Sequence, residues 1–420
     1  MNDAARTGGR VPVAALAVIA AGVAAALHIG KLPPAVPALQ AGLGLGLVEA
    51  GFLLSLVQVA GMSLGIFVGL AADSIGLRRS MLMGLALVSC ASLLGGCVGA
   101  SIHDKAQALP LLLALRALEG FGFLLAVMPG PGLIRTIVAP DAEKAAMGLW
   151  GAYMPLGVAL ALLAGPGFIA WFDWPGWWWA LGLLSAAAAV WVACVVPSDG
   201  RAKHLSGSAA QAWPGRLRET ASASAPWTLA LAFAVYSSQW MAVIGFLPAI
   251  YVDAGVPAGW TAALTALAAA ANIVGNVTGG RLLQRGVAPH RLLRWGFAVM
   301  ALGSVAAFAQ VGASQQALSL PPALRYLAVC MFSLGGGVVP ATLFLLGVRL
   351  APGPSTVSTT IGMMQQASSL GQFAAPPLVA WIAHRAGGWQ WTWVVTLACS
   401  LVGMALATRL WPASPRREAA

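Results

Sequence analysis

Long apolar runs alternate with short polar segments along almost the whole chain. A helix needs about 20 apolar residues to cross ~30 Å of hydrocarbon, and lipid offers no hydrogen-bond partner to an open backbone. The pattern therefore predicts an all-α membrane protein with twelve transmembrane helices. The candidate spans are residues 12–36, 46–70, 80–100, 108–129, 145–170, 175–196, 226–251, 258–281, 291–312, 323–347, 356–383 and 389–411.

One polar segment is much longer than the others and divides these spans into two sets of six. It begins at Pro197 and reads "PSDGRAKHLSGSAAQAWPGRLRETASASAP". Its Ser, Gly and Arg content is typical of a linker. The sequence thus predicts an N-terminal six-helix half over residues 1–196, a cytoplasmic linker over 197–225 and a C-terminal six-helix half over 226–420.

Glycines and tryptophans recur in the second half of the chain at a nearly constant spacing from those in the first. This periodicity indicates an internal repeat, and the alternative is coincidence in a chain with 50 glycines. Two pseudo-symmetric halves of this kind place a substrate site between them near the membrane midplane. The glycine pairs are Gly65 with Gly275, Gly69 with Gly279, Gly76 with Gly286, Gly120 with Gly335, Gly122 with Gly337, Gly148 with Gly362, and Gly157 with Gly371; the tryptophan pairs are Trp177 with Trp391 and Trp179 with Trp393.

Composition and charge exclude several classes of protein. Only 8% of residues are charged and 59% are hydrophobic, which rules out a soluble domain. The net charge of +11 comes from Lys and Arg scattered over short loops, not from the clustered basic face of a nucleic-acid-binding protein. Because basic loops stay on the cytoplasmic side, their distribution predicts a multi-pass protein with both termini cytoplasmic. The five cysteines lack metal-ligand spacing, so we expect neither a metal nor a cofactor.

Two short motifs carry a family resemblance. The stretch "GLAADSIGLRRS" lies between the second and third spans and holds Gly69, Asp73, Gly76, Arg78 and Arg79. The stretch "RALEGFG", residues 116–122, lies in the fourth span. In this order they resemble the signature loop and the fourth-helix motif of the major facilitator superfamily, with Glu119 in the place of a glutamine. The resemblance covers nearly the whole chain and implies the major facilitator fold.

The resemblance also implies a function and a role for the loop. It implies a bacterial inner-membrane secondary transporter that works by alternating access, in which Asp73 helps to latch the inner ends of the two halves together. Arg78 and Arg79 are either partners in this latch or residues that only hold the topology. The segments "HIGKLPPAVPALQAGLGLGLVEAGFLLSLVQ" and "GLWGAYMPLG" resemble more weakly the branch that includes bacterial cyanate and nitroimidazole transporters.

Four ionisable residues within the spans are candidates for substrate binding and proton coupling, because charge at membrane depth is costly. Arg116 and Glu119 lie three residues apart on one helix face. They form either a structural ion pair or a switch in which Glu119 accepts a proton and frees Arg116. His28 and Lys31 lie near the outer end of the first span, where Lys31 either extends to the headgroups or joins His28 and Arg116 in a cationic pathway that favours an anion.

Uncharged polar and aromatic residues supply further candidates. We expect some to line the substrate cavity, although amides and phenols in helix bundles often only bridge helices. The candidates are Gln58, Tyr153, Tyr236, Gln239, Trp240 and Gln366. Most of the 17 tryptophans fall in "WFDWPGWWW" and "WIAHRAGGWQWTW", where we expect them to anchor the protein at the outer interface.

These features favour a monomeric secondary transporter of a small organic anion, coupled to protons. No Gly-rich loop with a following Lys and Ser or Thr cradles a phosphate, so ATP is not expected as the energy source. Within transport, export of a drug or siderophore is the alternative. A membrane-embedded enzyme is disfavoured because the five histidines are widely spread, and a sensor is disfavoured because no soluble output domain is evident.

Overall fold

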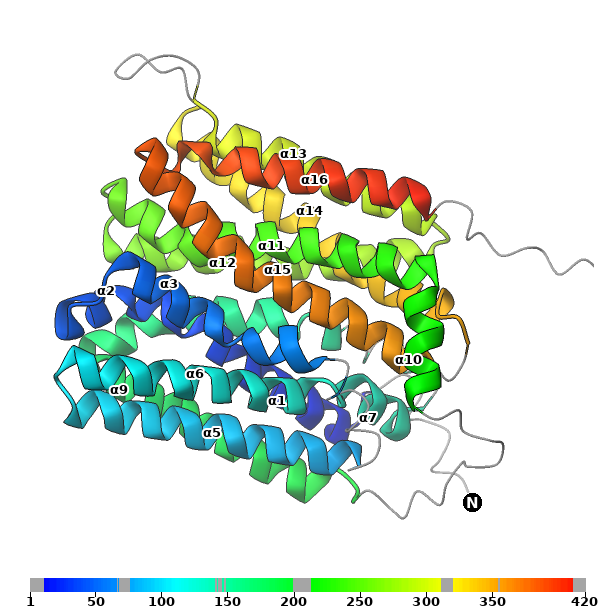
Figure 1. Ribbon diagram of the computed structural model, residues 1–420, viewed down its shortest axis with the longest axis horizontal. Coiled ribbons are helices and arrows are strands. Elements are labelled where there is room, and N and C mark those ends of the chain that lie inside the picture. The colour runs from blue at the N-terminus through cyan, green and yellow to red at the C-terminus, as the bar shows by residue number, and fades with distance from the viewer. Residues whose placement is uncertain are drawn as a thin grey trace, which may run out of the picture. The chain divides into compact units, whose positions relative to one another are not determined.

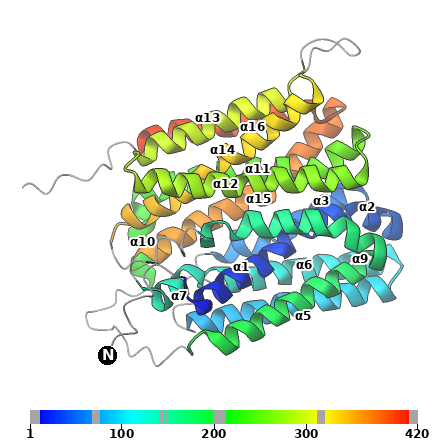
Figure 2. The same ribbon diagram turned by 180° about the vertical axis from the view of Figure 1, so that it is seen from behind.

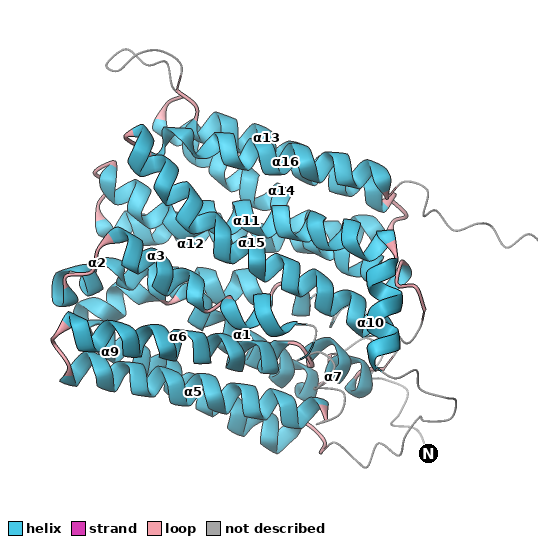
Figure 3. Cartoon of the chain, in the orientation of Figure 1, coloured by secondary structure: helices cyan, strands magenta, loops and turns pink. Residues whose placement is uncertain are grey.

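The computed structural model describes residues 11–65, 67, 76–139, 142, 146, 149–198, 213–310, 320–353 and 356–410. Every regular element in these ranges is helical (Figure 3). Nine helices among the described residues are long and apolar enough to cross a membrane. Large apolar side chains face outward, including Leu302 at 72% and Trp171 at 84% exposure, as expected for a surface solvated by lipid. The prediction of an all-α membrane protein is confirmed.

Contacts divide the chain into two compact units, Met1–Ala209 with Ile244–Ala270, and Ala210–Val243 with Ala271–Ala420. The division into halves at a linker over 197–225 stays a prediction, because residues 199–212 lie outside the described ranges. Helices of the first part of the chain are α1 (Val13–Gly30), α2 (Leu32–Leu43), α3 (Leu47–Leu56), α5 (Leu77–Ser101), α6 (Lys105–Val127), α7 (Gly130–Ile137) and α9 (Tyr153–Val195).

In the first unit, α9 packs along both α1 and α5, and α5 packs along α6 (Figures 1 and 2). The contact between α5 and α6 depends on Gly84 and Gly122. A Cβ atom added at Gly84 would lie 2.5 Å from the carbonyl oxygen of Gly122, and one added at Gly122 would lie 2.8 Å from the backbone nitrogen of Val88. Such close backbone approach is how small residues hold membrane helices together.

The second part of the chain continues with another set of helices. In the second unit, α13 packs along both α14 and α16. The elements are α10 (Trp213–Ser222), α11 (Ser224–Asp253), α12 (Ala258–Gln284), α13 (Pro289–Phe308), α14 (Pro322–Arg349), α15 (Val357–Ala386), the short 3-10 helix η3 (Trp389–Trp391) and α16 (Thr392–Arg409). The end of α11 and the start of α12 are the parts that group with the first unit.

Several expected spans differ in detail from the helices observed. The spans predicted over 145–170 and 175–196 are covered largely by α9, which is kinked at Asp173 (φ 58°, ψ 175°). The span predicted over 46–70 is interrupted, because α3 ends at Leu56 and residues 57–58 form a turn before the helical residues 59–65. The helix at the eleventh expected position, α15, is not among the nine apolar helices of the described chain.

The glycines that make equivalent contacts differ from some of those paired by spacing. In the first unit Gly122 meets Val88 of α5, whereas Gly120 meets Val57. In the second unit Gly335 of α14 meets α13 at Val299 and Gly296 O, in the same way that Gly122 meets α5 at Val88 and Gly84 O. Gly335 therefore corresponds by its contacts to Gly122 and not to Gly120. The spacing misaligned these pairs because glycines two residues apart look alike in sequence but face different helices.

Candidate functional site

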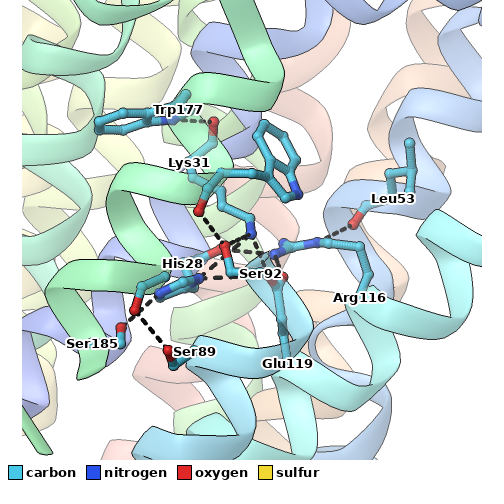
Figure 4. Close-up of polar contacts among 11 residues, drawn as sticks. His28, Lys31, Leu53, Ser89, Ser92, Arg116, Glu119, Trp177 and Ser185 are labelled. Atoms are coloured by element: carbon cyan, nitrogen blue, oxygen red, sulfur yellow. Dashed lines mark hydrogen bonds and ion pairs between the residues drawn. The ribbon is translucent and has the colours of Figure 1, made fainter. Parts of the chain in front are cut away.

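A buried cluster of ionisable side chains lies within the first unit (Figure 4). Arg116 and Glu119 come from α6, and their three-residue spacing puts them on one face of that helix. His28 lies in the last turn of α1, and Lys31 joins α1 to α2. His28 and Lys31 are 0% exposed, and Arg116 and Glu119 are 1% exposed. The structure thus brings together all four residues that the sequence singled out for substrate binding and proton coupling.

Glu119 is the centre of the cluster because each of its carboxylate oxygens faces a cation. Its Oε2 accepts a hydrogen bond from Arg116 Nη1 at 2.5 Å. Its Oε1 accepts a hydrogen bond from Lys31 Nζ and lies 3.6 Å from His28 Nδ1. The cluster therefore holds two cationic groups and one carboxylate, so it carries one more positive than negative charge when Lys31 is protonated and His28 is neutral.

Arg116 also binds two backbone carbonyls. Its Nε donates to Leu53 O at 3.1 Å, and its Nη1 donates to His28 O at 2.9 Å. In a continuous helix the Leu53 carbonyl would accept a hydrogen bond from the backbone N–H of Val57. Here α3 ends at Leu56 and the N–H of Val57 donates to Ser55 O instead, which leaves the Leu53 carbonyl available. Irregular backbone at membrane depth is tolerated where such a side chain satisfies it. The remaining amino group, Nη2, is buried and has no hydrogen-bond partner among the described residues.

Lys31 points inward, so the interpretation that it extends to the outer headgroups is wrong. Besides Glu119, its Nζ donates to Ser92 Oγ at 3.1 Å, and it lies 3.5 Å from His28 Nδ1. It also lies 4.5 Å from the centre of the Trp178 ring, close enough for a cation–π contact. Lys31 can be buried because the Glu119 carboxylate pairs with its ammonium, and a paired buried charge costs less than an unpaired one.

Three residues around Lys31 and His28 were not identified from the sequence. Ser92 of α5 donates to Trp178 O at 2.8 Å, and Ser185 of α9 lies 2.9 Å from His28 Nε2. Trp178 is only 3% exposed, so the interfacial anchoring expected for its segment does not apply to it. Serines in apolar spans are common as helix bridges. Nothing in the local sequence distinguishes these two from the others.

The second unit contains a buried polar network without charge. Asn272 of α12 donates to Tyr236 Oη at 3.2 Å and to Ser333 O at 2.9 Å. Trp240, which follows on α11, donates through Nε1 to Ser333 Oγ at 3.3 Å. Gln239 accepts from Ser400 Oγ at 2.9 Å, whereas its Nε2 is buried without a partner in the described chain. Three of the candidate lining residues thus hold helices of this unit together.

The other candidate lining residues lie apart from this network. Gln58 is 3% exposed and sits in the turn that follows α3. Tyr153 begins α9 and stacks on Trp150, with ring centroids 4.6 Å apart. Gln366 lies in α15, and its Oε1 is buried without a hydrogen-bond partner among the residues described.

The expected latch is described only in part, because Gly69 and Asp73 lie outside the described residues. Gly76 caps the N-terminus of α5 with φ 103°, a conformation that favours glycine. Arg78 Nη2 donates to Ala193 O at 2.7 Å, in the last turn of α9. A cation is favourable at this end of a helix, where carbonyls lack partners. Arg79 follows it on α5 and also makes contacts of its own.

Comparison with known proteins identifies the family. The protein-family model described as Major Facilitator Superfamily matches residues 14–368 of the chain. No curated protein matches the chain. Among solved structures, the Major Facilitator Superfamily transporter FucP in the outward conformation is 18% identical, with a TM-score of 0.68, over 96% of this chain and 99% of that one. A variant of the Escherichia coli fucose:proton symporter FucP is 17% identical, with a TM-score of 0.66, over 97% and 100%.

The family model spans most of the chain, and the likeness to FucP extends over nearly all of it. At such low identity the structural likeness shows the fold alone. The comparisons do not single out the cyanate and nitroimidazole branch. The chain is therefore a multi-pass membrane protein of the Major Facilitator Superfamily, a family of secondary transporters and not of enzymes.

Proposed function

We propose that this protein transports a small organic anion together with protons, by alternating access across the bacterial inner membrane. The observation that carries the proposal is the excess positive charge of the buried cluster, with Arg116 Nη2 lacking a partner among the described residues. A buried charge without a counter-ion is costly, and a bound anion removes this cost. A guanidinium suits a carboxylate because it presents donors in a planar fork.

Proton coupling is supported by the chemistry of the same cluster and by one relative. Lys31 and His28, which can gain and lose protons, lie within hydrogen-bond or ion-pair distance of Glu119, and Glu119 in turn binds the Arg116 guanidinium. FucP is described as a fucose:proton symporter, which makes coupling to protons a reasonable expectation for a chain of the same fold. We further propose that the protein acts as a monomer. We also propose that both termini lie in the cytoplasm, as the distribution of basic residues indicates.

The test is a ligand screen followed by transport. Purified protein is heated with small carboxylates, cyanate, neutral sugars, siderophores and lipophilic cations in turn. We expect a small anion to raise the melting temperature, because a ligand at 100 times its Kd adds about 2.7 kcal/mol of stability. The same anion should then accumulate in proteoliposomes that are acidic outside. Stabilisation by sugars, siderophores or cations alone would contradict an anion site and favour the competing functions.

For the loop after the second span we propose a conformational role, with Asp73 as the latch and Gly69, Gly76, Arg78 and Arg79 as its supports. Asp73→Asn should shift the balance between inner-open and outer-open forms, because the amide lacks the charge that a helix N-terminus or a basic side chain attracts. The measurement is labelling of cysteines introduced at the inner helix ends by a membrane-impermeant maleimide. Asp73→Glu, which keeps the charge, serves as the control, and equal labelling of Asp73→Asn and parent would refute the latch.

A further inference from the structure

We propose that Lys31, and not Glu119, carries the coupling proton, and that Glu119 transmits its presence to Arg116. This inference rests on the proposed function, because it assigns the proton within the same anion site. Three features of the cluster carry it: the placement of Glu119 between two cations, the complete set of acceptors around the Lys31 ammonium, and the unpartnered Nη2 of Arg116.

Glu119 is poorly placed to accept a proton. Its two oxygens bind two different cationic groups, Lys31 and Arg116, in a setting where all three side chains are buried. Protonation of this carboxylate would leave two neighbouring cations without a counter-ion. Since a buried charge that loses its partner is strongly destabilising, the carboxylate keeps its charge while Arg116 and Lys31 are both protonated.

Lys31 can release a proton at a much smaller cost. Its ammonium has three N–H donors. Glu119 Oε1 and Ser92 Oγ accept two of them, and His28 Nδ1 at 3.5 Å accepts the third when the neutral imidazole carries its proton on Nε2. With the proton lost to water, Arg116 and Glu119 remain as a neutral pair. Lysine can exist as a neutral amine in a buried site, whereas the arginine guanidinium keeps its proton. Among the described residues, the other side chain found against the Lys31 ammonium is the uncharged ring of Trp178.

The shared carboxylate couples this proton to the anion. While Lys31 is protonated, it holds Glu119 Oε1, so only Oε2 binds Arg116 and Nη2 is left for the substrate. When Lys31 loses its proton, the ion pair that holds Oε1 is lost, and Glu119 can pair with both amino groups of the guanidinium in the bidentate manner favoured by these groups. The Glu119 carboxylate then takes the place of the substrate anion at Arg116. One proton and one monoanion bind together, and the cluster carries no net charge either with both bound or with both absent.

The first experiment locates the proton without any substrate. Proton uptake by the purified protein is titrated from alkaline to mildly acidic pH, and pH-difference infrared spectra are recorded for the parent, Lys31→Arg and Glu119→Gln. We expect Lys31→Arg, which keeps the positive charge permanently, to take up one proton fewer than the parent. A protonated-carboxyl band in the parent that disappears in Glu119→Gln would overturn the proposal, as would equal uptake by Lys31→Arg and parent.

The second experiment tests the coupling through Glu119, with formate as the smallest carboxylate probe. Lys31→Met removes the ammonium, so Glu119 should pair with both amino groups of Arg116. The affinity for formate, measured from its effect on the melting temperature, should then fall about tenfold or more, which is the effect of one charged hydrogen bond. The double variant Lys31→Met/Glu119→Gln frees Arg116 again and should restore it. Weak binding by this double variant, when it is folded, contradicts the transmission through Glu119. A parent that formate does not stabilise contradicts the anion site instead, and the titration still decides where the proton binds.

Discussion

Arg116→Ala abolishes anion uptake while the protein still inserts into the membrane in near-parental amounts; this is the result we expect for the residue at the centre of the proposed site. The guanidinium is 1% exposed, and one of its amino groups is free among the described residues to bind an anion. A hydrogen bond between charged groups contributes about 1.5–3 kcal/mol, so its loss alone lowers affinity about 10- to 100-fold. Loss of the charge that balances the anion adds to this.

The variant should nevertheless fold. Removal of one partner from a buried ion pair costs about 3–5 kcal/mol when the other charge is left alone. Here Glu119 keeps Lys31 as a partner, so its carboxylate is not stranded. We therefore expect uptake in proteoliposomes to fall far more than the amount of folded protein in detergent, as measured by size-exclusion chromatography.

Two control variants separate charge and geometry from general damage. Arg116→Lys keeps a positive charge without the planar fork and should retain a small part of the uptake. Arg325→Ala removes another arginine that binds a backbone carbonyl, Ala307 O at 2.6 Å, and should leave uptake intact. If Arg116→Ala transports anions as well as the parent, this residue has no part in the mechanism.

Gly275→Ala should strongly reduce the stability of the fold, although it adds only one methyl group. Gly275 lies in α12, and a Cβ atom there would stand 1.9 Å from Leu334 O of α14. Leu334 O is part of a helix backbone, so it cannot move away by a rotamer change as the end of a side chain can. Overpacking of this kind costs about 1–3 kcal/mol, and sometimes more, because the helices must move apart. The change is measured as a fall in melting temperature in detergent.

Gly280, five residues along the same helix, supplies the matched control. A Cβ atom at this position meets nothing within 4 Å. Gly280→Ala should leave the melting temperature unchanged or raise it, since alanine is favoured over glycine inside a helix by about 0.5–1 kcal/mol. A melting temperature for Gly275→Ala at or above that of Gly280→Ala would show that α12 and α14 do not pack closely through this glycine.

Much of the fold followed from patterns that are local in sequence. The apolar runs predicted helices at every position where long helices are described, because hydrocarbon leaves the backbone no other partners. The pairing of Arg116 with Glu119 followed from their spacing, since residues three apart share a face of any α-helix. The break after α3 did not follow, because its apolar sequence looks continuous through Val57.

Contacts between helices had to come from the tertiary structure. The sequence left Lys31 with two positions, at the headgroups or inside, and the packing of α1 against α5, α6 and α9 decided for the inside. It likewise decided that Ser92, Ser185 and Trp178 are the neighbours of the cluster, and that Gly122 corresponds to Gly335. The sequence by itself determined which residues share a helix and a face, because helical periodicity is the same everywhere. Only the tertiary structure decided which faces meet, because the rotation and crossing of two helices depend on all the side chains between them.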